Sequence, residues 1–248
     1  MDLGLRGRRA LVTGASAGIG KAVALALAEA GCRVCIAARR AERLSAVVAA
    51  MGGEEAGHRA LAIDLMAAQA PAMVAEAAGE ADIIVHNLGG SLGERDPLAG
   101  ADSFARVWRF NVGIAIDINA LLAPAMAARG WGRIVHVSTR ASIDMRGAAA
   151  YSAAKAYLNA YTVSLGRALA PRGVIVSAVL PGAVATEDNN WGKARVDNPA
   201  RVAAFLAEHQ AIGRLGSVED VVPFVVFLAS ERNRFAAGAL VPVDGGAM

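Results

Sequence analysis

Short runs of apolar residues alternate with longer, alanine-rich runs along almost the whole chain of 248 residues. The short runs are rich in Val, Ile and Leu, which is typical of strands that are buried on both faces. The longer runs between them have the length and composition of helices. The predicted strands are 9–13, 33–37, 60–63, 82–86, 133–137, 174–179 and 239–243, and the predicted helices are about 18–30, 40–51, 68–78, 102–129, 151–170 and 218–230.

This alternation predicts an α/β fold with a doubly wound parallel sheet of about seven strands and helices on both faces. The chain shows no linker, low-complexity tract or internal repeat, so we expect residues 1–248 to form one domain. The stretch of about 185–211 fits the alternation least well, because it is polar around Asp188 and Trp191. We interpret it either as a lid over a binding cleft or as a surface insertion.

Composition and charge narrow the classes of function. Hydrophobic residues make up 55% of the chain and aromatic residues 5%, which suits alanine-rich helices on buried strands and excludes a disordered chain. The net charge of +3 is scattered, so we expect no nucleic-acid partner. The chain shows no secretory signal pattern and no unbroken apolar run of ~20 residues. We therefore expect no membrane association and a cytoplasmic location.

The two cysteines, Cys32 and Cys35, have the spacing C-x-x-C at a predicted strand. Side chains three residues apart on a strand point to opposite faces. No other Cys/His pair at ligand spacing accompanies them, so we expect buried thiols and no metal site.

A glycine-rich turn joins the first predicted strand to the first predicted helix. Gly14 permits a tight turn, Gly18 lets backbone N–H groups approach a pyrophosphate, and Gly20 lets the helix pack closely on the sheet. The positive end of the helix dipole then faces the phosphates. The turn therefore predicts a dinucleotide site, with a spacing that differs from G-x-G-x-x-G and from a phosphate loop.

Tyr151 and Lys155 are four residues apart in a predicted helix, which places both side chains on one face. A free tyrosine has a pKa of about 10, and a nearby ammonium group lowers it. Such a tyrosine can give a proton to a carbonyl group or take one from an alcohol. The pair therefore predicts acid/base chemistry.

These motifs occur in an order that resembles the short-chain dehydrogenases/reductases over nearly the whole chain. Within the family, the chain as a whole is similar in a general way to the 3-oxoacyl reductase-like group. The resemblance implies a Rossmann-type fold and transfer of hydride between a nicotinamide and a carbonyl or secondary alcohol. The segments that carry it are Thr13–Gly20, Asn87-Leu88-Gly89-Gly90, Phe110-Asn111-Val112, Tyr151–Lys155, Pro181–Thr186, Gly213–Gly216 and Val243–Gly246.

The resemblance also implies roles for individual residues. Lys155 would bind the nicotinamide ribose, Asn111 would hold a water, and a hydroxyl after the fifth strand would polarise the substrate oxygen. The family's spacing from Tyr151 favours Ser138 for this hydroxyl, and alignment of the strand favours Thr139; our first choice is Ser138. The expected catalytic residues are Asn111, Ser138, Tyr151 and Lys155, and the expected cofactor-binding residues are Gly14, Ser16, Gly18, Ile19, Gly20, Arg39, Arg40, Asp64, Leu65, Asn87, Gly89, Tyr151, Lys155, Pro181, Gly182, Val184 and Thr186.

The end of the second predicted strand indicates which nicotinamide cofactor binds. NAD-binding relatives carry an acid there for the ribose 2′-hydroxyl, and this chain has Arg39 and Arg40. Guanidinium groups suit a 2′-phosphate, so NADP(H) is favoured, with NAD(H) as the alternative.

The sequence leaves the substrate open within one class, a small-molecule carbonyl or alcohol. The first candidate is a 3-oxoacyl thioester or similar ketone, and the second is a sugar or other secondary alcohol. A regulator that binds dinucleotide without catalysis, or an epimerase or dehydratase, is the alternative of another class. We expect a homotetramer or homodimer, because Ala153, Ala156 and Ala160 would let helices approach closely.

Overall fold

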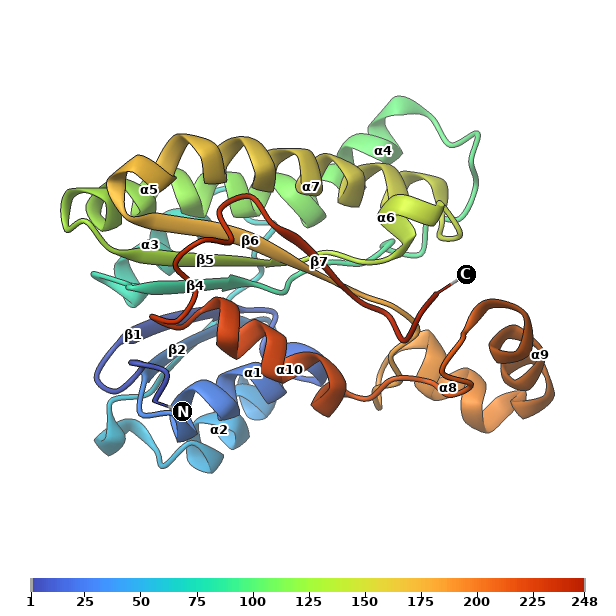
Figure 1. Cartoon of the computed structure of the whole chain (residues 1–248), viewed down its shortest axis with the longest axis horizontal. Helices are drawn as coiled ribbons and strands as arrows, with labels where there is room; N and C mark the ends of the chain where they lie inside the picture. Colours follow the sequence, from blue (N-terminus) through green and yellow to red (C-terminus); the bar gives the residue numbers. More distant parts are fainter. Residues whose placement is uncertain (1, 248) are drawn as a thin grey trace.

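The computed structural model describes residues 2–247 of the chain. Seven parallel strands form one sheet in the order β3-β2-β1-β4-β5-β6-β7 (Figure 1). The strands are β1 Arg9–Thr13, β2 Arg33–Ala38, β3 Arg59–Ala62, β4 Ile83–His86, β5 Gly132–Val137, β6 Val174–Pro181 and β7 Leu240–Val243. This is the predicted doubly wound sheet, and each strand end lies within one residue of its predicted position except that of β6, which runs two residues further.

Helices cover both faces of the sheet (Figure 1). Helices α1, α2 and α10 pack on one face, and α3, α5 and α7 pack on the other. The helices are α1 Gly18–Glu29, α2 Ala41–Ala50, α3 Ala70–Ala78, α4 Ala101–Trp108, α5 Ile114–Ala128, α6 Ala141–Asp144, α7 Ala149–Leu169, α8 Asn190–Asp197, α9 Pro199–His209 and α10 Val218–Leu228, with short 3₁₀ turns η1 Glu54–Ala56 and η3 Ala170–Arg172 and a π turn η2 Arg109–Gly113.

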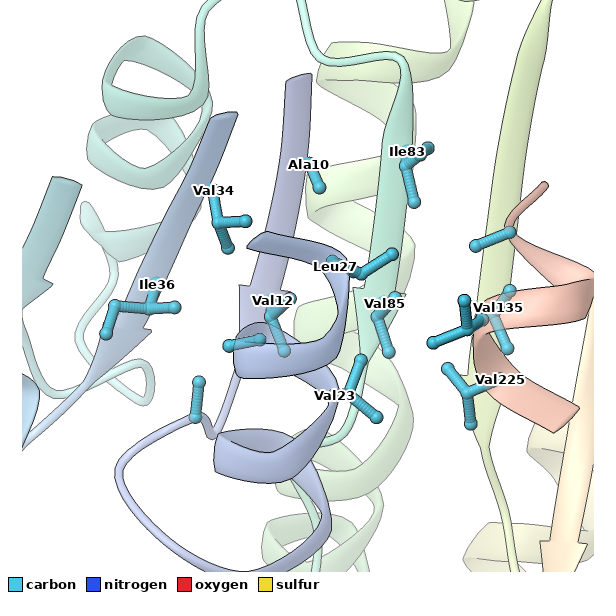
Figure 2. Close-up of a cluster of buried hydrophobic side chains, with 14 of the residues drawn as sticks. Ala10, Val12, Val23, Leu27, Val34, Ile36, Ile83, Val85, Val135 and Val225 are labelled. Atoms are coloured by element: carbon cyan, nitrogen blue, oxygen red, sulfur yellow. The ribbon is translucent and has the colours of Figure 1, made fainter. Parts of the chain in front are cut away.

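Strand residues alternate between two hydrophobic cores. Val12, Val85 and Val135 point toward Leu27 of α1 and Val225 of α10 (Figure 2). Their sequence neighbours, including Leu11, Ile84 and Ile134, join the core beneath α3 and α5. Successive residues of a strand are both apolar because helices cover both faces of the sheet. This explains the continuous apolar runs in the sequence.

The two cysteines lie on opposite sides of the sheet, as predicted. Cys32 belongs to the core with α1 and donates a hydrogen bond from Sγ to the carbonyl oxygen of Leu5 at 3.3 Å, whereas Cys35 belongs to the opposite core. Burial raises the pKa of the Cys32 thiol to about 12 and that of Cys35 to about 11. Both groups therefore remain unreactive thiols near neutral pH.

The single helix predicted over 102–129 is a continuous helical segment of α4, η2 and α5. Residues 101–128 are long and apolar enough to cross a membrane, contrary to the expectation that polar residues break every such run. More than half of the most apolar window is buried inside the molecule, because α5 packs against α3 and the sheet. A core helix of a soluble fold has the same length and composition, so this segment is weak evidence for a membrane span.

The segment 185–211 contains two helices that the sequence did not predict, α8 and α9, and Figure 1 shows them beyond the end of β6. Asparagine side chains cap both helices. Asn189 accepts a hydrogen bond from the backbone of Gly192 at 2.8 Å, and Asn198 accepts one from Arg201 at 3.0 Å.

Candidate active site

The site begins where β1 and β4 lie side by side, because the chain leaves the two strands in opposite directions at this point. The side chain of Asn87, after β4, donates a hydrogen bond to the carbonyl oxygen of Gly14, after β1, at 3.1 Å. A Cβ atom at Gly20 would collide with this Asn87 amide and with the Gly14 carbonyl. Gly14 has a φ of 68°, a left-handed conformation that favours glycine. The close packing thus requires glycine at both positions.

A groove of about 490 Å³ runs from this turn across the carboxyl ends of the strands. Many predicted cofactor-binding residues line it, and residues outside that predicted set complete it. The predicted lining residues are Gly14, Ser16, Arg39, Arg40, Asp64, Leu65, Asn87 and Gly89, and the others are Ala38, Ile63, Leu88, Phe110, Asp188 and Lys193.

The N-terminus of α1 fits a pyrophosphate. The first backbone N–H groups of a helix have no partner within the helix, and the N-cap residue Ala17 supplies no side-chain hydrogen bond to them. Thr186 lies over this turn, since a Cβ atom at Gly18 would be 3.4 Å from its side chain. The glycine turn therefore provides a cradle of backbone donors with Thr186 at its edge.

The remaining predicted cofactor residues lie around this cradle. Ile19 packs against the core of α1, and Pro181 ends β6. A Cβ atom at Gly182 would collide with the backbone of Asp244, and Val184 bridges to Gly216. These residues support the turn and the start of the 185–211 segment.

Basic side chains gather at the end of the groove beside β2. The Arg40 guanidinium lies 3.3 Å from the Ser16 hydroxyl and 3.3 Å from the Asp188 carboxylate. Arg43, one helical turn further along α2, also donates to Asp188. Arg43 was not among the predicted cofactor-binding residues, although a spacing of three residues from Arg40 places it on the same helix face.

Lys155 is the most deeply buried charged side chain of the site, with 2% of its surface exposed. Its Nζ donates a hydrogen bond to the carbonyl oxygen of Val137 at 2.8 Å. Burial lowers the pKa of Lys155 to about 7. A Cβ atom at Gly89 would be 2.8 Å from this Nζ, so Lys155 meets the floor of the groove at Gly89.

Asn111 reaches the same point from the opposite side. It lies in the π turn η2, a distortion that often marks functional positions in helices. Its amide donates to the carbonyl oxygens of Val107 and Gly90, each at 2.8 Å, and its Oδ1 accepts from the Gly90 backbone at 3.0 Å. Asn111 therefore holds the loop that follows β4 in place beside Lys155.

Tyr151 faces a hydroxyl group from the end of β5, and that group belongs to Thr139. Burial raises the pKa of Tyr151, and a side-chain hydrogen bond with Thr139 opposes this rise. The expectation that Lys155 lowers the pKa of Tyr151 is therefore not met, because desolvation dominates.

The two candidate hydroxyls of the sequence analysis, on Ser138 and Thr139, differ in their surroundings. The Ser138 Oγ is buried and makes no hydrogen bond with any of residues 2–247. Ser142, in α6, holds the neighbouring backbone: its Oγ donates to the Thr139 carbonyl oxygen at 2.6 Å and accepts from Asn159 at 2.7 Å. The geometry thus favours Thr139 over our first choice.

A family model described as short chain dehydrogenase matches residues 8–195, which is most of the chain. The chain belongs to the short-chain dehydrogenase/reductase family. It is therefore an NAD(P)(H)-dependent oxidoreductase that acts on carbonyl or secondary alcohol groups, as the sequence motifs predicted.

Individual members of the family resemble this enzyme along its whole length. L-xylulose reductase of Mesocricetus auratus is 33% identical over 99% of this chain and 98% of its own. The crystal structure of L-sorbose reductase from Gluconobacter frateurii, complexed with NADPH and L-sorbose, has a TM-score of 0.90 and 30% identity over 99% and 98% of the two chains. A 3-oxoacyl (acyl-carrier-protein) reductase structure from Agrobacterium tumefaciens with NADP bound has a TM-score of 0.90 and 32% identity over 99% and 96%.

A buried polar network lies behind the site of this reductase, between β4, β5, α5 and α7. His86 donates from Nε2 to Asn119 Oδ1 at 2.9 Å, and the Asn119 amide lies 3.4 Å from His136 Nε2. His136 contacts Thr162 Oγ1 through Nδ1 at 2.8 Å, and Thr162 donates to the Leu158 carbonyl. In this chain His136 accepts at Nε2 and donates at Nδ1, which is the pattern of a neutral ring, and His86 carries its proton on Nε2. Burial lowers the pKa of His86 to about 4 and that of His136 well below its ordinary value.

Proposed function

We propose that this enzyme is an NADP(H)-dependent ketone reductase whose substrate is a neutral polyhydroxy ketone. Two contacts carry the proposal: Thr139 makes a side-chain hydrogen bond with Tyr151, and Lys155, one helical turn along α7, lies beside Gly89, which lines the groove. A proton donor, a hydrogen-bonding hydroxyl and a buried lysine are the groups that carbonyl reduction needs beside a nicotinamide.

The arginine end of the groove supports NADP(H) as the cofactor. Arg39 and Arg40 line the groove, Lys193 adds a third cation, and the two residues directly after β2 are both arginines rather than an acid. Guanidinium groups bind phosphate in a bidentate manner, so these residues suit a 2′-phosphate. The two similar solved structures named above contain NADPH and NADP, which agrees with this assignment.

The raised pKa of Tyr151 suits the role of proton donor in carbonyl reduction. Because burial raises the pKa of Tyr151, its hydroxyl stays protonated near neutral pH and can protonate a carbonyl oxygen. Thr139 would donate a hydrogen bond to the same oxygen, and Lys155 would hold the nicotinamide ribose. The bound nicotinamide supplies the hydride, and Asn111 keeps the Gly90 backbone in place beside Lys155.

The charges beside the site favour a neutral substrate. Arg140, which follows β5, forms ion pairs with two carboxylates: Asp244 at 3.2 Å and Asp144 at 3.8 Å. Its charge is therefore compensated. Sugar ketone reductases recur among the relatives, including enzymes that reduce L-xylulose and D-erythrulose. The second candidate is a 3-oxoacyl thioester, which the similar Agrobacterium tumefaciens structure favours.

The test is a spectrophotometric assay with NADPH and NADH against keto sugars, oxoacyl thioesters and simple diketones. Wild type and Tyr151→Phe are compared, because the variant keeps the ring and removes the proton donor. We expect oxidation of NADPH with keto sugars and a loss of at least ~10²-fold in kcat for the variant. Turnover with thioesters only would establish the second candidate. Equal turnover by both proteins would contradict the assignment of Tyr151.

The remaining proposals concern the whole protein. We infer that residues 1–248 form one domain in which the 185–211 segment acts as a lid, since Thr186 and Asp188 lie over the groove. The protein would be cytoplasmic and homotetrameric. The exposed positions Ala153 and Ala160 of α7 support association through this helix.

A further inference from the structure

Asp188 connects the lid segment to the arginine end of the groove. It lies just before α8 and lines the groove together with Arg39 and Arg40. Its carboxylate accepts hydrogen bonds from Arg40 at 3.3 Å and from Arg43. These ion pairs join residues that are far apart in the sequence, and they hold the lid segment against the start of α2.

The same guanidinium groups are the ones that suit the 2′-phosphate of NADPH. Arg40 also lies 3.3 Å from the hydroxyl of Ser16, which belongs to the glycine turn. A phosphate that approaches Arg40 from the groove finds the Asp188 carboxylate already bound to the same guanidinium group. Two anions at one arginine repel each other, so one of them must give up its contacts.

We propose that Asp188 competes with the cofactor's 2′-phosphate for Arg40 and Arg43, and so sets how strongly the enzyme prefers NADPH to NADH. NADH carries no 2′-phosphate and leaves these ion pairs intact. NADPH displaces the carboxylate, which releases residues 186–189 from α2. Asp188 therefore weakens NADPH binding selectively and lets the phosphate open one attachment of the lid. This inference rests on the proposed use of NADP(H).

Nucleotides that lack the nicotinamide test the proposal by binding alone, without turnover. Isothermal titration calorimetry would measure binding of 2′,5′-ADP and 5′-AMP, which differ only in the 2′-phosphate. The variant is Asp188→Asn, which keeps size and removes charge at an exposed position. The control is Glu187→Gln, which removes the same charge one residue earlier.

We expect Asp188→Asn to bind 2′,5′-ADP about three- to tenfold more tightly than wild type, as removal of an exposed ionic competitor implies. Binding of 5′-AMP stays the same, and Glu187→Gln changes neither. The difference between wild type and Asp188→Asn shrinks at high salt, because exposed charges are screened. A lower rate of NADPH dissociation from the variant is the kinetic counterpart, measured by displacement of the bound, fluorescent cofactor.

Other outcomes overturn the proposal. Unchanged or weaker binding of 2′,5′-ADP by Asp188→Asn would show that the carboxylate does not compete. Equal tightening for both nucleotides would show an effect on the lid alone. If wild type itself fails to prefer 2′,5′-ADP over 5′-AMP, the proposed NADP(H) dependence falls together with this inference. A wild-type preference that the variant leaves unchanged overturns only the role of Asp188.

Discussion

Lys155 is a buried lysine, and its burial costs the fold stability. Its pKa is about 7 in the folded protein, against about 10.4 in an unfolded chain. Between these values the unfolded chain holds a proton that the folded one lacks, so stability rises with pH across this window. Below pH 7 Lys155 is protonated in both the folded and the unfolded state, and the full free-energy cost of burying its charge is present.

Replacement of this lysine by methionine should therefore stabilise the protein and abolish activity. We expect Lys155→Met to unfold with a free energy about 1–3 kcal/mol higher at pH 6, after the lost hydrogen bond to Val137 is deducted. The gain should shrink as the pH rises toward 10. Urea unfolding at several pH values measures it, with the exposed Lys21→Met as control. A variant that is less stable than wild type at pH 6 would contradict the cost assigned to Lys155.

The hydroxyl beside Tyr151 gives a second test at the scale of single residues. Thr139 contacts Tyr151, whereas the Ser138 hydroxyl is buried without a partner among residues 2–247. We expect Thr139→Ala to lose ~10²-fold or more in kcat, as is typical when a donor to the reacting oxygen is removed. Ser138→Ala should keep most of its activity. The reverse order would restore Ser138 as the catalytic hydroxyl.

The choice between these two residues shows what the sequence alone leaves open. The ladder between β5 and β6 continues past β5, because the backbone of Ser138 donates to Val179 and that of Arg140 to Pro181. Successive side chains of an extended segment point to opposite faces, so this pairing decides which hydroxyl meets Tyr151. Residue spacing cannot show it, since the loop between β5 and α7 has no fixed length.

At the scale of elements, β4 and β5 each bury a histidine on the same face of the sheet. The rings of His86 and His136 lie 5.3 Å apart between centroids, and both stay neutral in the fold. An unfolded chain protonates histidine at about pH 6.5. Below that pH the unfolded state binds protons that the folded state does not, so stability falls as the pH falls from 6.5 toward 4.

Removal of one histidine should therefore make stability less sensitive to acid. For His86→Asn or His136→Asn, we expect the slope of unfolding free energy against pH between 6 and 4.5 to decrease by up to about 1.4 kcal/mol per pH unit. The slope is informative even where the substitution lowers stability overall. His209→Asn, on α9 outside the sheet, is the control. An unchanged slope in both strand variants would mean that these histidines titrate normally.

Strands were easier to predict than helices α8 and α9 for a physical reason. Each strand is buried on both faces and so leaves an apolar run in the sequence, as Ile83-Ile84-Val85 does in β4. Helices α8 and α9 bury little: α8 has no buried residue and α9 has only Val202. Their ends depend on asparagine caps, and a polar segment with few apolar positions gives no helical period.

At the scale of the whole molecule, topology brings together residues that no local pattern connects. Glycine spacing locates the phosphate cradle because its residues are adjacent in sequence. The contact between Arg43 and Asp188 joins α2 to the segment before α8, and only the folded sheet places these elements at one edge. The cofactor groove was therefore predictable around the glycine turn, whereas its contact with Asp188 was not.

The outer surface of α7 carries the last prediction. Ala153 and Ala160 are exposed there, and Tyr157 between them is 51% exposed and packs edge-on against Trp108 of α4. A helix face of small residues beside an exposed aromatic permits close approach of a second helix, which buries apolar surface that a monomer leaves in water.

We therefore expect the wild-type protein to be a homotetramer in light scattering at micromolar concentration, and Ala160→Glu to shift it to dimers or monomers. A buried, unpaired carboxylate in a helix interface costs several kcal/mol. This cost exceeds the free energy that one such helix contact contributes to association. Ala49→Glu, on the exposed face of α2, should leave the mass unchanged. A monomeric wild type, or a variant of unchanged mass, would remove α7 from the assembly. Since Ala160 lies more than two helical turns from Tyr151, a change in mass reports the interface rather than a disturbed active site.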